Sequence, residues 1–164
     1  MQIRTARLIL RPLADADLED LVALHADPQV TRFVRALGRE QAISWLAQAQ
    51  QHWRQHGYGP MAIYERRTAR FLGRSGLKLW PQFGEIEVGW ILRKDAWGSG
   101  YATEAGRACL DWGFARLDVS YITAMIQPAN TASIRVTERL ALAPIRDDAL
   151  LGDAVRVYAK HRDR

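Results

Sequence analysis

Hydrophobic and polar positions recur along this chain with two periods, and each change of period marks a new element. Residues 5–11 alternate, which predicts a strand with Leu8 and Leu10 on one face. Apolar positions three and four residues apart predict one helix near residues 15–26 and a second from Arg39 to His56. The residues expected on the apolar side of the second helix are Ile43, Leu46 and Trp53.

The middle and end of the chain alternate between strand and helix patterns. Three strands are expected at residues 61–65, 71–79 and 85–92, and the short turns between them favour an antiparallel meander. A helix, a strand, a helix and two strands follow at residues 102–116, 121–126, 130–140, 145–150 and 155–160. The order βαα-βββ-α-β-α-ββ predicts a mixed α/β protein with one mostly antiparallel, seven-stranded sheet and about four helices.

Composition narrows the class of protein. Hydrophobic residues make up 48% and charged residues 25% of the 164 residues, which excludes a disordered or fibrous chain. No repeat or linker interrupts residues 1–164, so we expect one domain. No signal peptide and no apolar run of ~20 residues is present, and Cys109 is the sole cysteine. We therefore expect a cytoplasmic protein with no membrane partner.

The net charge of +5 suggests an anionic partner. Nucleic acid is one candidate and a polyanionic cofactor is another. The basic residues are scattered rather than clustered, which argues against nucleic acid as the main partner.

A turn between residues 85–92 and 102–116 is the strongest candidate for binding chemistry. Gly98 and Gly100 allow a close approach of the backbone to an anion, and free amides at a helix start attract phosphate. A plain helix cap is the alternative. The turn lacks the third glycine of G-x-G-x-x-G, where Thr103 stands, and it lacks the Lys of a Walker A loop.

Asn130 begins a second strand-to-helix unit, after the strand at residues 121–126. Asparagine is a natural N-cap, and that role alone can explain it. The alternative is that its amide faces a ligand between two diverging strands.

Four segments carry short motifs in a fixed order. They are Thr5-Ala6-Arg7-Leu8-Ile9-Leu10-Arg11-Pro12-Leu13, Glu87-Val88-Gly89-Trp90-Ile91-Leu92, Trp97-Gly98-Ser99-Gly100-Tyr101-Ala102-Thr103-Glu104-Ala105 and Asn130-Thr131-Ala132-Ser133-Ile134-Arg135-Val136. Together they resemble the GNAT family of acetyl-CoA-dependent N-acetyltransferases, in particular its RimJ/RimL-like branch of ribosomal-protein N-terminal acetyltransferases. The resemblance covers nearly the whole chain and implies the GNAT fold, with acetyl-CoA as the co-substrate.

The resemblance also implies roles for matching positions. The backbone of Ile91, Leu92 and Arg93 would pair with the pantetheine arm like an added strand. Asn130 would contact the same arm. The amides expected to hold the pyrophosphate are those of Gly98, Ser99, Gly100, Tyr101, Ala102 and Thr103. On the helix that follows Asn130, Arg135 and Arg139 are either phosphate ligands or solvated side chains.

The chain departs from the family pattern at the expected proton donor. Many GNAT proteins carry a tyrosine seven residues after the asparagine, and Thr137 stands there. Ser133 is the substitute candidate, as a hydrogen-bond donor to the leaving thiolate. Capping of the first helical turn is its alternative role.

Glu87 is the candidate base for direct attack of an amine on the thioester. It lies on the strand beside the expected cofactor, and a neutral amine is needed for attack. Glu85 falls on the same face, so the two carboxylates are expected to hold a cationic substrate or raise one another's pKa. An exposed polar strand face is the alternative. A strand amide near Leu92 would polarise the thioester carbonyl.

Other chemistries find little support in the sequence. His52 and His56 have no obvious third ligand, so we expect no metal. Cys109 lies mid-helix among small and apolar residues, which favours a packed thiol. Tyr158 is expected in the core.

The acceptor pocket is expected between the second helix, the loop at residues 33–35 and the last hairpin. The aspartates Asp147, Asp148 and Asp153 lie near that hairpin. Three functions stay open: acetylation of a protein or peptide N-terminal α-amine, acetylation of a small-molecule amine, and non-catalytic acyl-CoA binding. A groove open at both ends favours a peptide, and a closed pocket favours a small amine. Homodimers are common in the family.

Overall fold

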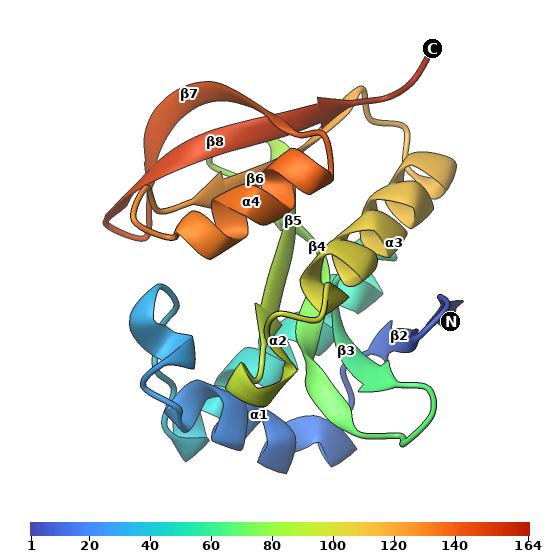
Figure 1. The fold of residues 1–164 in the computed structure, drawn as a ribbon, viewed down its shortest axis with the longest axis vertical. Coiled ribbons are helices and arrows are strands. Elements are labelled where there is room, and N and C mark those ends of the chain that lie inside the picture. Colours follow the sequence, from blue (N-terminus) through green and yellow to red (C-terminus); the bar gives the residue numbers. More distant parts are fainter.

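One eight-stranded sheet organises the molecule, and the computed structural model describes all residues from 1 to 164 (Figure 1). The strands are β1 (Ile3–Arg4), β2 (Leu8–Pro12), β3 (Pro60–Glu65), β4 (Phe71–Trp80), β5 (Glu85–Leu92), β6 (Tyr121–Ile126), β7 (Ala143–Leu150) and β8 (Asp153–His161). The helices are α1 (Leu18–Ala26), α2 (Arg39–His56), α3 (Tyr101–Arg116) and α4 (Thr131–Arg139), with short 3₁₀ turns η1 (Asp15–Asp17), η2 (Val30–Arg32) and η3 (Lys94–Ala96).

The predicted mixed α/β architecture and four helices are confirmed, but the count of seven strands is wrong. The additional strand is β1, which pairs with β2 through Ile3 and Leu10. A two-residue strand is too short to show alternation, so the sequence pattern could not reveal it. The first predicted strand also begins later than expected, because Thr5 to Leu8 form a turn in which the Thr5 amide donates to the Leu8 carbonyl.

The sheet order is β1-β2-β3-β4-β5-β6-β8-β7. Every neighbouring pair is antiparallel except β5 and β6, which are parallel and register at one position, Glu87 opposite Thr123. The helix α3 connects these two strands, as a parallel pair requires a crossover. Beyond that position the two strands diverge.

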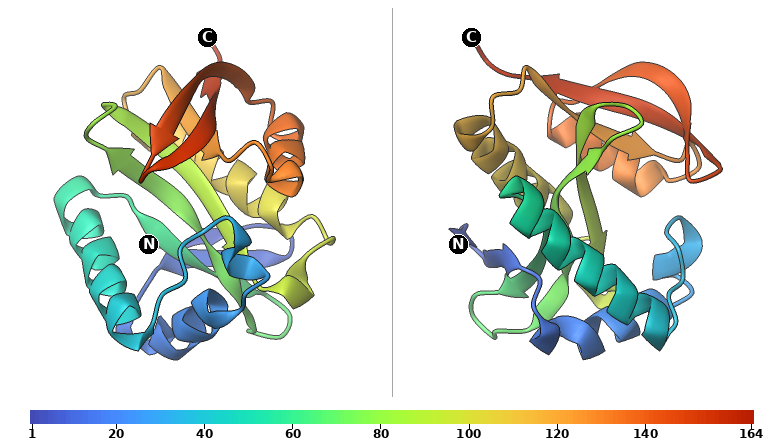
Figure 2. Two further views of the ribbon diagram at one scale, coloured as in Figure 1. Left: turned by 90° about the vertical axis from the view of Figure 1, so that its left-hand side faces the viewer. Right: turned by 180° about the vertical axis from the view of Figure 1, so that it is seen from behind.

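Helices cover both faces of the sheet. Ser75 and Leu77 of β4 face α3, where they approach Cys109 and Gly113. On the other face, α1 and α2 pack on the β2–β4 half through Leu21 and other buried apolar residues, namely Leu13, Leu24, Leu46, Ala62 and Phe71. The left view of Figure 2 looks onto β4 and β5 between α2 and the β7–β8 hairpin.

The apolar side of α2 differs from the expected one. Ile43 is 47% exposed, whereas Ala42, Leu46 and Ala49 are buried. The helix therefore packs through Ala42 and Ala49 together with the expected Leu46. No helix in the molecule is long and apolar enough to cross a membrane.

Two paired glycines in the centre of the sheet yield a stability prediction. A Cβ on Gly76 would lie 2.4 Å from the carbonyl oxygen of Gly59, on a backbone with φ of +142°. Gly76→Ala is therefore expected to lower the free energy of unfolding by at least about 2 kcal/mol in denaturant titrations. Its cross-strand partner Gly89 has nothing within 4 Å, so Gly89→Ala is the matched control and should leave stability unchanged or slightly raised. Equal losses for the two variants would contradict the prediction.

Candidate active site

The divergence of β5 from β6 opens a gap whose edge is unpaired main chain. The Arg93 amide donates to the Leu72 carbonyl, so the alternation of the antiparallel ladder turns the main-chain groups of Trp90 and Leu92 away from β4. Trp97 Nε1 donates to the Leu92 carbonyl at 3.0 Å. Of the three residues predicted to pair with a ligand arm, Leu92 faces the gap, whereas Ile91 and Arg93 lie in ladder register with β4.

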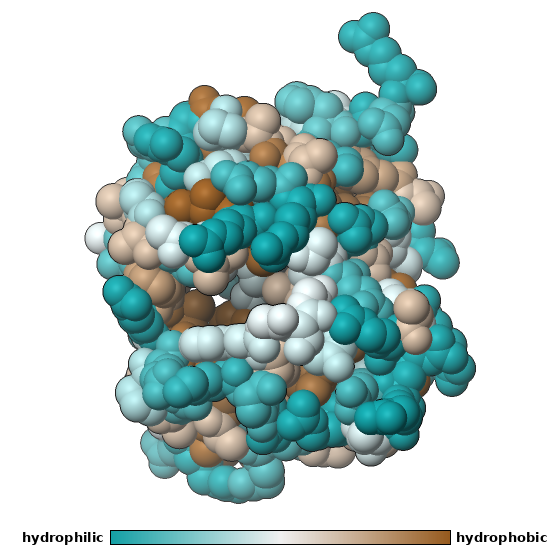
Figure 3. Space-filling view, in the orientation of Figure 1, coloured by the Kyte–Doolittle hydropathy of each residue, from teal (hydrophilic) through white to brown (hydrophobic).

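Figure 3 shows the surface hollowed between the part that carries α4 and the part that carries α1, with hydrophobic residues at its bottom. A hollow of about 470 Å³ lies between α1, η2 and η3, and no residue of α4, β5 or β6 lines it. Its wall bears charges of both signs, including Asp20, Asp27, Arg93 and Lys94.

The predicted phosphate-binding turn has the geometry of an anion cradle. Gly98 and Gly100 adopt φ of +77° and +81°, and a Cβ at Gly98 would meet nothing within 4 Å. The first amides of α3, which begins at Tyr101, have no partner within the helix. Thr103 Oγ1, in the first turn of α3, is the only buried side-chain nitrogen or oxygen in the molecule without a hydrogen-bond partner. These groups fit a ligand that presents oxygen acceptors, as a pyrophosphate does.

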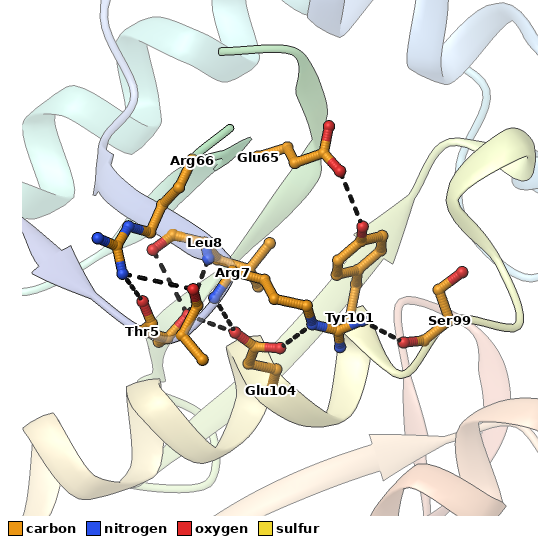
Figure 4. A network of polar contacts seen from close by, with 9 residues as sticks. Thr5, Arg7, Leu8, Glu65, Arg66, Ser99, Tyr101 and Glu104 are labelled. Carbon is orange, nitrogen blue, oxygen red and sulfur yellow. Dashed lines mark hydrogen bonds and ion pairs between the residues drawn. The ribbon is translucent and has the colours of Figure 1, made fainter. Parts of the chain in front are cut away.

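A network from the N-terminal segment braces this turn (Figure 4). Arg7 donates from Nη1 to the Ser99 carbonyl at 2.8 Å and from Nε to Glu104 at 2.7 Å. The Arg7 amide and the Thr5 hydroxyl also donate to Glu104, at 2.8 and 2.6 Å. Burial opposes the charge on Glu104, but these hydrogen bonds outweigh it and lower the pKa of the carboxyl. Sequence reasoning missed this role, because Arg7 and Glu104 are 97 residues apart.

Glu87 lies where β5 and β6 part. Its Oε1 accepts from Trp80 Nε1 at 2.9 Å, and its Oε2 accepts from the Met125 amide of β6 at 3.1 Å. Burial raises the pKa of Glu87, and the two hydrogen bonds only partly offset that rise. A carboxylate with a raised pKa at the apex of a gap is suited to accept a proton.

Glu85 has a different role from Glu87. Arg146 of β7 donates to both of its oxygens, at 2.5 and 3.0 Å, and Tyr121 donates at 2.9 Å. The hydrogen bonds from Arg146 lower the pKa of Glu85 despite its burial. The expectation that Glu85 and Glu87 raise one another's pKa is therefore wrong for Glu85, which forms an ion pair between β5 and β7.

Asn130 and Ser133 are connected by the predicted helix cap. The Asn130 side chain accepts from the Ser133 amide at 3.2 Å. Ser133 Oγ accepts from Trp90 Nε1 at 3.2 Å, which joins α4 to β5 and leaves the hydroxyl proton free to be donated. Thr137 is buried and donates to the Ile134 carbonyl within its own helix. Arg135 and Arg139 are exposed.

The remaining candidates are structural. Burial raises the pKa of Cys109 to about 12, so the thiol is unreactive, and Tyr158 is buried in the core. His52 Nδ1 hydrogen-bonds to the Tyr58 carbonyl, and the Leu79 amide donates to His52 Nε2, so neither ring nitrogen is free. Near the last hairpin, Asp147 and Asp148 already pair with Arg156 and Arg146. The structure contains no group of three His, Cys, Asp or Glu residues that could hold a metal ion.

Comparison with known proteins agrees with this geometry. The sequence profile described as "Acetyltransferase (GNAT) domain" matches residues 7–142. The protein YkkB of Bacillus subtilis is 35% identical over 144 residues, which cover 84% of this chain and 83% of YkkB. The chain therefore belongs to the GNAT family of acetyltransferases, whose domains use acetyl-CoA.

Solved structures show the same fold. An acetyltransferase from Agrobacterium tumefaciens superposes with a TM-score of 0.86 at 31% identity, over 99% of this chain and 95% of the other. A Salmonella typhimurium enzyme that modifies the N-terminal serine of ribosomal protein L7/L12 superposes with a TM-score of 0.85, over 99% of this chain and all of the other. Its identity of 17% supports likeness of fold alone.

The Arg7–Glu104 network predicts a selective effect on cofactor binding. Arg7→Met removes the donor to Ser99 and frees the turn, so the KM for acetyl-CoA should rise about fivefold, equivalent to about 1 kcal/mol, with kcat little changed. Arg156→Met is the matched control, because Arg156 is also exposed and also pairs with one carboxylate, Asp147. Initial rates at varied acetyl-CoA test this, and equal KM values for the two variants would refute the bracing role.

Proposed function

We propose that the protein transfers the acetyl group of acetyl-CoA to a primary amine, at the N-terminus of a protein or peptide. The observation that carries this proposal is the gap between β5 and β6, which has Glu87 at its apex and the α3 turn at its open end. An unpaired strand edge, an anion cradle and a carboxylate with a raised pKa are the three parts that such a reaction needs.

Each part of the gap has a task in this proposal. The edge at Leu92 pairs with the amides of the pantetheine arm, and Asn130 lies near the same arm. The amides of residues 98–103 and the hydroxyl of Thr103 bind the pyrophosphate. Acetyl-CoA supplies the thioester, an acyl group already activated for attack.

Glu87 accepts a proton from the incoming amine, directly or through water. A neutral amine nitrogen then forms the new bond to the acetyl carbon, and the C–S bond breaks. As the amide forms, the nitrogen loses a second proton, which the leaving thiolate takes up, and the Ser133 hydroxyl donates a hydrogen bond to the sulfur. An α-amine has a pKa near ~8, so it loses its proton more easily than a lysine with a pKa near ~10.4.

The acceptor has two candidate classes. The Salmonella enzyme, which acts on the N-terminal serine of a ribosomal protein, has the same fold and supports an N-terminal α-amine. A small-molecule amine is the second candidate. Arg74 supports this class, because it is a half-buried cation on the open face of β4 that pairs with no carboxylate of the chain. It is therefore free to bind the acidic group of a small acceptor such as a free amino acid.

Thermal unfolding tests the cofactor site first. Acetyl-CoA at ~100 times its dissociation constant should stabilise the folded protein by about 2.7 kcal/mol and raise Tm by several degrees, whereas NAD and ATP should not. Release of free thiol is then followed with peptides of different first residue, free amino acids and polyamines. An absence of any shift at millimolar acetyl-CoA would overturn the proposal.

The role of Glu87 predicts a pH signature. Its folded pKa is raised, and the carboxylate is the form that accepts a proton, so kcat/KM should fall as pH drops through that pKa. Glu87→Gln should lower kcat at least about 100-fold and remove this acidic limb. Unchanged turnover at every pH would contradict the assignment.

Trp80→Phe is the companion variant, because it keeps the carboxylate and removes one hydrogen bond. The Trp80 bond lowers the pKa of Glu87, so its loss should raise that pKa and move the acidic limb to higher pH. A purely structural role for Glu87 predicts no movement of the limb.

A further inference from the structure

A strip of polar residues and glycines runs along the open face of β4 and β5. The register pairs Gly76 with Gly89 and Lys78 with Glu87, and Arg74 lies two residues before Gly76. Alternate residues of a strand share a face, so these five lie on the face opposite Ser75 and Leu77, which meet α3. The strip therefore faces the side of the sheet that carries α1 and α2.

Arg74 forms no hydrogen bond or ion pair with a carboxylate, although Glu87 on the same face is near enough to favour its charge. Its Nε donates to His25 Nε2 at 3.3 Å, and its guanidinium lies 4.3 Å above the ring of Trp45. Burial lowers the pKa of His25 to about 4, so this histidine is neutral at pH 7 and cannot compensate the charge. Arg74 takes part in none of the ion pairs of the molecule.

Two other partly buried arginines differ from Arg74 because each forms an ion pair with a carboxylate. Arg11 donates through two nitrogens to Asp17, and Arg146 donates through two nitrogens to Glu85. Desolvating a guanidinium without a counter-charge costs free energy, and burial lowers the pKa of Arg74 to about 10. A carboxylate or phosphate from outside the chain would satisfy its free N–H groups in the bidentate geometry that guanidinium prefers.

Space for such a group exists beside Arg74. Gly76 and Gly89 carry no side chains, and a Cβ on Gly89 would meet nothing within 4 Å. Trp45 stands at the Arg74 end of the strip, and Trp80 binds Glu87 at the other. The floor is therefore open at Gly89, while at Gly76 the main chain of Gly59 lies close, and a tryptophan stands at each end.

The two ends of the strip differ in charge, because Arg74 stands alone at one end whereas Glu87 at the other lies opposite Lys78. Glu87, the proposed base, receives the amine, and Arg74 lies four residues along β4 from Lys78, the partner of Glu87. Four residues of strand span about 13 Å between Cα atoms, a distance that an acceptor with an amine at one end and an acidic group at the other can bridge together with the two long side chains. The charges of Arg74 and Glu87 already influence one another's ionisation across this floor.

We propose that Arg74 is a specificity-determining residue that binds an acidic group of the acceptor, so that the preferred acceptor is an amine whose own molecule carries a carboxylate or phosphate. The amine lies at Glu87 and the acidic group lies at Arg74. This inference rests on the proposed acetyl transfer and names its substrate class. A free amino acid and a peptide with an acidic first side chain offer the same chemistry.

Matched acceptor pairs test the proposal. Aminoalkyl carboxylates of increasing chain length are compared with their amides, and phosphoethanolamine is compared with ethanolamine. At the best chain length, the wild-type protein should have a kcat/KM at least tenfold higher for the carboxylate than for its amide. The same margin is expected for phosphoethanolamine over ethanolamine. Two C-terminally amidated tripeptides, beginning with Asp or with Asn, test whether a peptide side chain can supply the acid. Equal rates within every pair would overturn the inference and leave the acetyltransferase assignment intact.

Variants locate the preference at Arg74. Arg74→Met should reduce the acid-to-amide ratio to near one while activity on the neutral amines persists, and Arg74→Lys should retain part of the ratio. Arg156→Met, on the exposed side of β8, is the control and should keep the wild-type ratio. A ratio unchanged in both Arg74 variants would refute the assignment, and the lysine variant serves if the methionine variant fails to fold.

A binding readout separates this inference from the proposed function. Tryptophan fluorescence, with Trp45 stacked on Arg74, is titrated with the best carboxylate and with its amide in the absence of turnover. Tighter binding of the acid that is lost in Arg74→Met would uphold the anion site even if no amine were acetylated. Equal binding of acid and amide, with acetyl transfer to both, would refute the site and keep the function.

Discussion

The single parallel contact between β5 and β6 is the constraint on which the rest of the site depends. Each strand has a full antiparallel partner on its other side, β4 for β5 and β8 for β6, so the two can part after Glu87 and Thr123 without leaving the sheet. Buried main-chain groups require partners, and a gap of this kind leaves them for water or a ligand. Glu87 closes the apex, because its carboxylate accepts the Met125 amide just past the last strand pairing.

At the end of the gap that is proposed to bind an anion, the positive potential comes chiefly from the main chain. Gly98, Gly100 and the start of α3 present amides, while the nearest arginine, Arg7, is engaged by Glu104 and the Ser99 carbonyl. Arg7 therefore shapes the turn instead of binding the anion directly. This explains why a net charge of +5 indicated an anionic partner without locating its site.

The sequence predicted the four helices and seven of the eight strands, with starts up to three residues away from the observed ones, because apolar periodicity is a local property. The limits of α2 and β5 agree with the structure residue for residue, whereas β1 was missed and Ile43 was placed on the wrong side of α2. The glycines between a strand and a helix pointed to the turn at Gly98, and the motif resemblance made Glu87 the candidate base. What the pattern could not supply was pairing over long separations, such as Arg7 with Glu104. Such contacts depend on the topology of the sheet, which periodicity does not encode.

In this protein, buried charged residues with a structural role form ion pairs, whereas the buried charged residues of the candidate site do not. Glu85 and Glu87 lie two residues apart on one strand, yet Arg146 lowers the pKa of the first and burial raises the pKa of the second. Arg11 is satisfied by Asp17, whereas Arg74, on the same face as Glu87, has only a neutral imidazole and an aromatic ring. A fold can retain a partly desolvated charge without a counter-ion at a site where a bound molecule supplies the opposite charge. In the function proposed here, these two groups, one of each sign, select an acceptor that carries both an amine and an acidic group.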